Sequence, residues 1–188
     1  MIVLNLAILL ISVVFHEVAH GYMALNFGDD TAKKANRLKL NPIAHIELFG
    51  TILLPLMLHL SGSGFMFGWA KPVPINYSKL KNPKKNIFWV SLAGPLTNFF
   101  LVFIFYIFLK IGLGLTHAIL PYLEQNDFLV YLLKDQNNFL NILKEGLIYS
   151  VLAIIVLGSF IGIMLNLVLG IFNLIPIPPL DGSRIVYS

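Results

Sequence analysis

The sequence alternates between long apolar runs and shorter polar stretches, and three of the runs are long enough to cross a membrane. Residues 1–27 begin with fifteen residues that carry no charge, and residues 87–115 and 147–174 are apolar over a similar length. A helix rises 1.5 Å per residue and the hydrocarbon core of a bilayer is about 30 Å thick, so roughly 20 apolar residues span it. The pattern predicts three transmembrane helices at these positions.

A fourth apolar run, residues 49–67, differs from the other three. It contains Pro55 and His59, and a Ser-Gly-Ser-Gly stretch interrupts it at 61–64. Apolar runs of about 10–14 residues are typical of re-entrant or interfacial segments, so we predict that 49–67 re-enters the membrane without crossing it. In the polar loops on either side, 28–48 and 68–86, we expect short β-strands, at residues 37–40 and 71–76.

Composition agrees with a membrane protein. The chain has 188 residues, of which 57% are hydrophobic and 12% charged, and its mean hydropathy is +0.82. Soluble domains average about 45–50% apolar and about 25% charged residues. We therefore predict an all-α integral membrane protein with a single membrane-embedded domain over 1–188, and we exclude a soluble enzyme, a nucleic-acid-binding module and a disordered chain. The absence of cysteine excludes disulfides and thiolate metal sites.

The basic residues indicate the orientation. Nine of the thirteen lie in the two polar loops: Lys33, Lys34, Arg37, Lys39, Lys71, Lys79, Lys81, Lys84 and Lys85. If 49–67 re-enters, all nine fall on one side of the membrane, as the positive-inside rule prefers. We therefore expect both loops to face the cytosol.

The first apolar run contains a motif with a specific chemistry, His16-Glu17-Val18-Ala19-His20. Residues four apart lie on one face of a helix, so both imidazoles can bind one zinc ion while Glu17 reaches a zinc-bound water. The alternative is a pair of buried histidines beside a stray acid. An ionisable residue within a membrane segment is costly unless it has a function or a partner, which favours the metal site.

A catalytic zinc ion takes three protein ligands and keeps a fourth position for water, so a third ligand is expected. The candidates are the acids of the connection 115–146 together with His45, Glu47, His59, His117 and Asp181. Asp181 differs from the rest because it is the only acid after Glu145 and follows prolines that must end the third apolar helix. A turn aspartate preceding a glycine is the alternative interpretation.

Three blocks together resemble the site-2 protease family of intramembrane zinc metalloproteases: HEVAH at 16–20, SLAGPLTNF at 91–99 and NLIPIPPLDG at 173–182. The loops at 28–51 and 68–76 look like those of the compact subgroup without a PDZ insertion. The resemblance implies one Zn²⁺ per chain, with His16, His20 and Asp181 as ligands and Glu17 as the catalytic acid/base. It also implies that Asn173 lines the active site, where its amide could donate to an oxyanion. The alternative is that Asn173 stabilises the helix end before Pro176.

Three features depart from the family's pattern. Asn36 stands where the subgroup has glycine, and asparagine tolerates the left-handed backbone that such a turn requires. Glu47 stands where aspartate is more usual. Family members normally continue past the LDG block with another apolar segment, whereas six residues follow Gly182 here. We therefore expect a C-terminally truncated or unusually short member.

The implied function is hydrolysis of peptide bonds in or near transmembrane segments of membrane protein substrates, at a site near the cytosolic face of a bacterial inner (plasma) membrane. A divalent-metal transporter or a metal-sensing membrane protein, with His16, His20 and Asp181 as ligands, is the alternative. A transport site requires no general base, so the presence of Glu17 favours the protease over the transporter. A proteolytically inactive scaffold that binds partner helices is a third possibility, disfavoured because the core residues are intact.

Overall fold

A computed structural model describes residues 2–62, 68–121 and 127–188. Its three long helices are α1 (Ile2–Asn26), α4 (Pro83–Ile119) and α7 (Leu147–Asn173), and each is long and apolar enough to cross a membrane. The prediction of three apolar helices is thus confirmed, although α4 extends four residues further at each end than its apolar run indicated.

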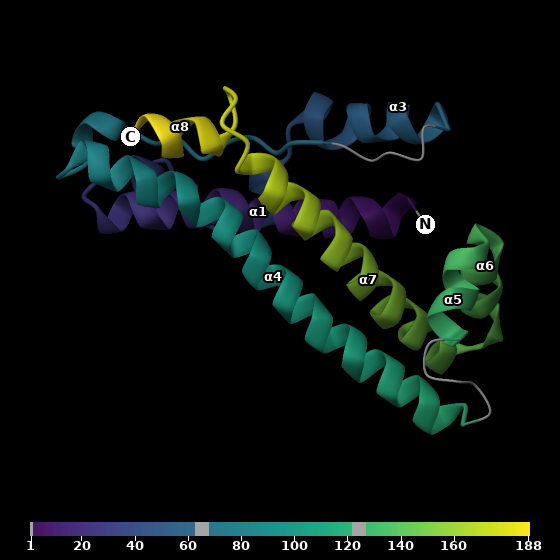
Figure 1. The fold of residues 1–188 in the computed structure, drawn as a ribbon. Helices are drawn as coiled ribbons and strands as arrows, with labels where there is room; N and C mark the ends of the chain where they lie inside the picture. Colours follow the sequence, from purple (N-terminus) through teal and green to yellow (C-terminus); the bar gives the residue numbers. More distant parts are fainter. Residues whose placement is uncertain (1, 63–67, 122–126) are drawn as a thin grey trace.

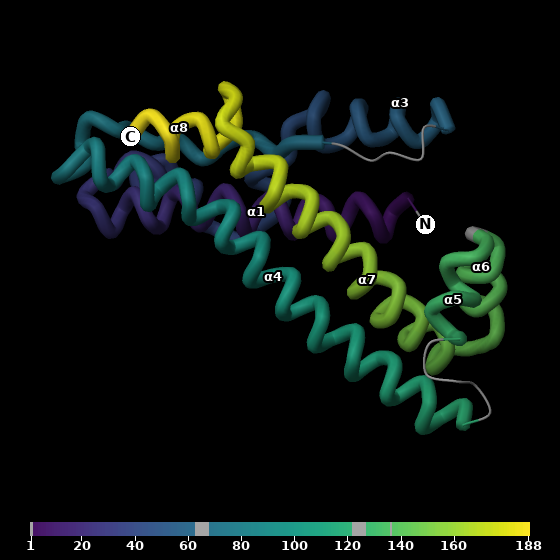
Figure 2. The backbone as a smooth tube through the Cα atoms, in the orientation of Figure 1, coloured from purple at the N-terminus to yellow at the C-terminus, as the bar shows by residue number. Residues whose placement is uncertain are grey.

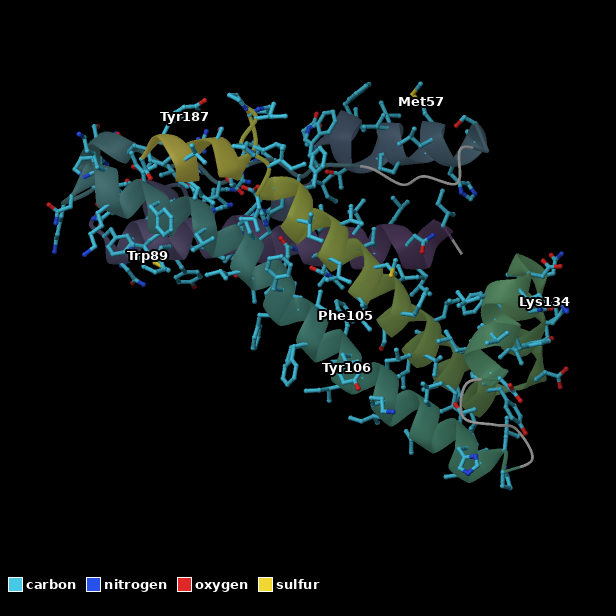
Figure 3. The ribbon with its side chains drawn as sticks, viewed as in Figure 1. Met57, Trp89, Phe105, Tyr106, Lys134 and Tyr187 are labelled. Atoms are coloured by element: carbon cyan, nitrogen blue, oxygen red, sulfur yellow. The ribbon has the colours of Figure 1, made fainter. Side chains whose placement is uncertain are left out.

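The long helices pack against one another along much of their length. Figure 1 shows α4 and α7 side by side, both crossing α1 obliquely. In Figure 3, Phe105 of α4 lies on the side towards α7, whereas Tyr106 points away from the helices and is 52% exposed. The polar atoms within this bundle are concentrated where α1, α4 and α7 meet.

Short helices occupy the connections. The first polar loop contains α2 (Thr31–Lys34) and a 3-10 turn (Pro42–His45), and the second contains a 3-10 turn (Tyr77–Lys79). The helices α5 (Asp127–Lys134) and α6 (Gln136–Glu145) join the far ends of α4 and α7, and α8 (Asp181–Tyr187) follows α7. The tube in Figure 2 shows α8 turning back beside the first half of α4.

The segment predicted to re-enter the membrane begins as a π-helix (Leu48–Leu53) and continues as α3 (Leu54–Leu60). Together they form an apolar helix of 13 residues, shorter than a span. The chain then returns to its starting point, because the backbone N–H of Trp69 donates to the carbonyl of Gly50 at 3.1 Å. Entry and exit therefore lie side by side, as a re-entrant segment requires. Residues 63–67 of the predicted segment lie outside the described residues.

The short β-strands predicted in the polar loops are not confirmed, because the described residues contain no strand. Residues 37–41 and 68–76 are irregular in secondary structure, and their polar backbone groups bond to other partners. The N–H of Val73 donates to the Glu17 carboxylate at 2.9 Å, and that of Asn76 donates to the Asp29 carboxylate at 2.6 Å. The Glu17 and Asp29 carboxylates thus accept hydrogen bonds that the backbone of a partner strand would accept in a sheet.

Candidate metal centre

Three potential metal ligands from opposite ends of the sequence converge at the bundle. The Nε2 atoms of His16 and His20 lie 3.1 Å apart, and Oδ2 of Asp181 lies 3.2 Å from the first and 3.1 Å from the second. Both histidines are buried. Among the described residues this is the one group of three or more metal-binding side chains whose ligand atoms lie this close together. The structure thus brings the three sequence-predicted ligands to one point.

Asp181 reaches the histidines because α7 ends where the sequence predicts. Helix α7 stops at Asn173, and the following residues, which include Pro176, Pro178 and Pro179, form turns instead of continuing it. Proline cannot donate the backbone hydrogen bond that a helix interior needs. The chain therefore reverses, and α8 begins with Asp181 against the HEVAH turn of α1.

Each histidine is oriented through its other ring nitrogen by α4. Nδ1 of His16 lies 2.6 Å from Oδ1 of Asn98, and Nδ1 of His20 lies 2.6 Å from the carbonyl oxygen of Val90. A carbonyl oxygen can only accept, so each Nδ1 must be the protonated nitrogen. In the neutral imidazoles, both Nε2 atoms then present lone pairs to Asp181, as metal-binding histidines do.

The donor set fits a zinc ion. Two imidazole lone pairs and a carboxylate oxygen converge, and no proton lies between the two Nε2 atoms, so the lone pairs repel one another. A cation placed among the three groups would remove this repulsion. Tetrahedral zinc, with bonds of about 2.0–2.1 Å, holds neighbouring ligand atoms about 3.3 Å apart. The observed separations of 3.1–3.2 Å are close to this spacing.

A buried hydrogen-bond chain extends from His16 across all three long helices. Nδ2 of Asn98 donates to Oδ1 of Asn166 at 2.8 Å, and Nδ2 of Asn166 donates to Oγ of Ser12 at 2.8 Å. All three side chains are fully buried. Asn98 lies in the SLAGPLTNF block, but neither it nor Asn166 was among the predicted site residues, although an asparagine within an apolar span was a usable signal.

Gly94 allows α4 to approach the two candidate histidine ligands. A Cβ atom at this position would overlap the imidazole rings of both His16 and His20. Glycine is therefore required for the close approach that brings Val90 and Asn98 within hydrogen-bonding distance of the two rings. The sequence showed a glycine here but not which side chains it faces.

Glu17 and Asn173 lie beside the three ligands. They line a cavity of about 360 Å³ together with His16, His20 and Asp181. Oε2 of Glu17 accepts the Val73 N–H, whereas Nδ2 of Asn173 donates to the carbonyl of Leu169 in its own helix at 2.9 Å. Since an amide nitrogen carries two protons, one N–H of Asn173 remains for another acceptor.

A second cavity, of about 250 Å³, shares three polar residues with the first, His16, Glu17 and Asn173, as well as Pro179 and Leu180. Its remaining walls are mainly apolar: Val13, Gly68, Trp69, Ala70, Leu169 and Phe172. His16, Glu17 and Asn173 therefore lie between two cavities, of which the second has mainly apolar walls.

The other candidate ligands lie elsewhere. His45 is buried and its Nε2 lies 2.9 Å from the carbonyl of Lys39, whereas the Glu47 carboxylate accepts the backbone N–H groups of Phe49 and Gly50. His59 is exposed on α3, and His117 lies in the last turn of α4. Asn36 has a φ of 57°, so it adopts the left-handed conformation expected at this position.

Comparisons with known proteins agree with this geometry. The family model for peptidase family M50 matches residues 4–188. A curated relative, "Putative zinc metalloprotease YwhC" of Bacillus subtilis (strain 168), is 39% identical over 178 residues, which cover 95% of this chain and 65% of the relative. The chain thus spans less than two thirds of that relative's length. No solved structure matches significantly.

Proposed function

The chain belongs to peptidase family M50, and from this premise we propose that it is an intramembrane zinc endopeptidase that cleaves membrane protein substrates in or near their transmembrane segments. The observation that carries the proposal is the convergence of His16, His20 and Asp181 beside the Glu17 carboxylate in one cavity. The relative's printed name and the family both agree with a zinc ion as cofactor.

Each residue of the centre has a role in the proposed reaction. His16, His20 and Asp181 hold the ion, which when bound acidifies a water molecule and polarises the scissile carbonyl. Glu17 accepts the proton of the attacking water and delivers it to the leaving amine. Asn173 donates its second N–H to the oxygen of the scissile carbonyl as negative charge develops there, a contact of roughly 3 kcal/mol where comparable donors have been removed.

The substrate is expected to approach along residues 68–73, because the first half of this segment lines the apolar cavity and Pro72 and Val73 line the cavity beside Asp181. Pairing of an unwound substrate strand with residues 71–76 would need free backbone donors. Pro72 and Pro74 have none, and the N–H groups of Lys71, Val73 and Asn76 are already bonded. Hydrogen bonds to a substrate strand would therefore come mainly from the carbonyls of this segment.

We further propose a single membrane-embedded domain over 1–188 whose centre opens towards the cytosol across a bacterial inner membrane. The nine basic residues of the two polar loops favour this side. Figure 3 places Trp89, near the start of α4, and Lys134, at the end of α5, at opposite ends of the molecule. A cysteine introduced at Lys33 should be labelled by an impermeant reagent only after the cytosolic face is exposed.

Replacing Glu17 by glutamine tests the function directly. The purified wild type and Glu17→Gln are reconstituted with single-span membrane proteins, and both cleavage and bound zinc are measured. We expect the variant to keep its zinc and to lose about 10²- to 10⁴-fold in cleavage rate. Cleavage at the wild-type rate by Glu17→Gln would contradict the proposal. Zinc flux through liposomes, with no cleavage by either protein, would instead favour the transporter.

A further inference from the structure

The Glu17 carboxylate is held by a backbone group from a different part of the chain. Its Oε2 accepts the Val73 N–H at 2.9 Å, and its Oε1 makes no hydrogen bond within the part of the chain that the structure describes. One oxygen is thus fixed while the other is available to the cavity. A general base must be held within hydrogen-bonding reach of the proton it takes, and a displacement of about 1 Å can cost about 10²-fold in rate.

The donor belongs to a segment that is stiff and tied at both ends. Val73 stands between Pro72 and Pro74, whose rings fix φ and which carry no N–H. Before them, the N–H of Lys71 donates to the carbonyl of His45 at 2.9 Å. After them, the N–H of Asn76 donates to the Asp29 carboxylate at 2.6 Å. These two hydrogen bonds hold the segment so that the N–H of Val73 is directed towards Glu17 of α1.

Gly21 determines how closely this segment approaches α1. It lies one helical turn after Glu17, on the same face. A Cβ atom at position 21 would lie 2.8 Å from Cγ1 of Val73 and 2.5 Å from Cδ2 of Leu38, closer than real contacts allow. A side chain at this position must displace the Val73 and Leu38 side chains. Because the branched valine side chain is stiff at χ1, we expect Val73 to move away from α1 together with its N–H, the donor to Glu17.

Asp29 anchors the segment after α1 ends. It is fully buried and accepts hydrogen bonds from the N–H and the hydroxyl of Thr31 as well as from Asn76. Burial alone raises the pKa of the Asp29 carboxyl, but these hydrogen bonds outweigh burial and hold the pKa below its usual value. Asp29 is therefore a charged acceptor at neutral pH.

We propose that residues 71–76 position the catalytic carboxylate of Glu17, and that Gly21 and Asp29 are positioning residues that hold this segment against α1. The proposal rests on the proposed function, because it assigns the segment a role through Glu17. It predicts a loss in the chemical step without loss of the metal. A Cβ at Gly21 would meet Leu38, Val73 and Ala32, and the Asp29 carboxylate bonds to Thr31 and Asn76, so neither change acts directly on the side chains of the three candidate ligands.

The test compares two pairs of variants. Gly21→Ala is matched by Gly114→Ala, a helical position with no atom within 4 Å of an added Cβ. Asp29→Asn is matched by Asp30→Asn, whose carboxylate pairs only with Lys34 and Lys79 in the described structure. For each purified protein, bound zinc, kcat and KM are measured on a single-span substrate.

We expect Gly21→Ala to keep one zinc per chain and a KM within about twofold of the wild type, while kcat falls about 10- to 100-fold. Asp29→Asn should lower kcat less, because asparagine can still accept from Asn76, and both controls should resemble the wild type. The inference is overturned if Gly21→Ala keeps the kcat of Gly114→Ala, or if zinc is lost from both Gly21→Ala and Asp29→Asn. Failure of the proposed function would instead appear as full activity in Glu17→Gln.

Discussion

The two ends of the long helices are held together by different kinds of interaction. At the metal centre, buried hydrogen bonds connect His16, Asn98, Asn166 and Ser12 across α1, α4 and α7. At the other end, α5 and α6 pack on α4 and α7 through an apolar cluster. Its buried members are Leu113, Phe128, Leu132, Phe139, Leu152, Ala153, Val156 and Leu157.

Both ends also contain a cavity, and the larger one is not at the metal centre. The cavity beside α5 and α6 measures about 520 Å³, against about 360 Å³ for the one beside Glu17. Cavity size therefore does not locate the chemistry in this molecule. The convergence of buried polar groups locates it instead. Each buried donor or acceptor must be oriented towards a hydrogen-bond partner, whereas apolar packing is non-directional.

The largest effect on zinc affinity is expected from a substitution of Asn98. Replacing it by leucine removes the acceptor for Nδ1 of His16 and the donor to Oδ1 of Asn166, so His16 loses its fixed orientation. We expect zinc affinity to fall about 10- to 100-fold, as for other residues that orient metal ligands. Competition with a zinc chelator measures this affinity.

The control for that prediction is Thr97→Val. Oγ1 of Thr97 donates to the carbonyl of Ala93 in its own helix, so the change should leave zinc affinity unaltered. Equal zinc affinity in Asn98→Leu and Thr97→Val would show that the buried hydrogen-bond chain does not support the metal centre.

A substitution at the other end should separate stability from metal binding. Leu132 is 1% exposed within the apolar cluster, so Leu132→Ala leaves a cavity that lowers the free energy of unfolding by about 2–5 kcal/mol. Zinc affinity should stay at the wild-type value. Denaturation and chelator competition, performed in parallel, measure both quantities.

Leu133→Ala is the matched control, because Leu133 is 48% exposed and its truncation leaves no buried cavity. A loss of zinc affinity in Leu132→Ala as large as in Asn98→Leu would mean that the two ends are energetically coupled. The contrast between them would then not hold.

The smallest effect is expected at the rim of the metal-centre cavity. Nη1 of Arg184 donates to the hydroxyl oxygen of Tyr77 at 2.5 Å, and its guanidinium carbon lies 5.1 Å from the centre of the ring. Tyr77→Phe removes the hydrogen bond but keeps the ring, so unfolding should cost about 1 kcal/mol less. Denaturation of the two proteins measures this difference.

The effect of Tyr77→Phe should not depend on pH near neutrality. Burial raises the pKa of the Tyr77 phenol above its ordinary value of about 10, so the hydroxyl keeps its proton throughout the neutral range. A stability difference that changes between pH 6 and pH 8 would contradict this assignment of the contact.

The sequence predicted the elements better than their mutual contacts. Apolar run length located the three long helices within a few residues, and helical spacing placed His16 and His20 on one face. The partners of those histidines depend on how α4 is rotated about its axis, which the run length does not determine. The role of the Val90 carbonyl as the partner of His20 could not be predicted from the sequence, because every residue has a backbone carbonyl.

The missing strands have a related cause. Residues 71–76 have the alternation and prolines of an edge strand, but their backbone donors bond to Glu17, Asp29 and a loop carbonyl. Which partner a backbone N–H takes depends on tertiary structure. The position of Asp181 beside the two histidines, by contrast, was predictable, since Asp181 is the only acid after the proline-terminated helix and lies in a block that resembles the family.

We propose above all that Asp181 completes a zinc site with His16 and His20, which lie at least 161 positions earlier in the chain. The zinc content of Asp181→Ala tests this most directly. His59→Ala, which changes an exposed histidine on α3, is the control. We predict one zinc per chain in the wild type and in His59→Ala, and loss of the bound zinc in Asp181→Ala. One tightly bound zinc per chain in Asp181→Ala, with unchanged affinity, would contradict the account.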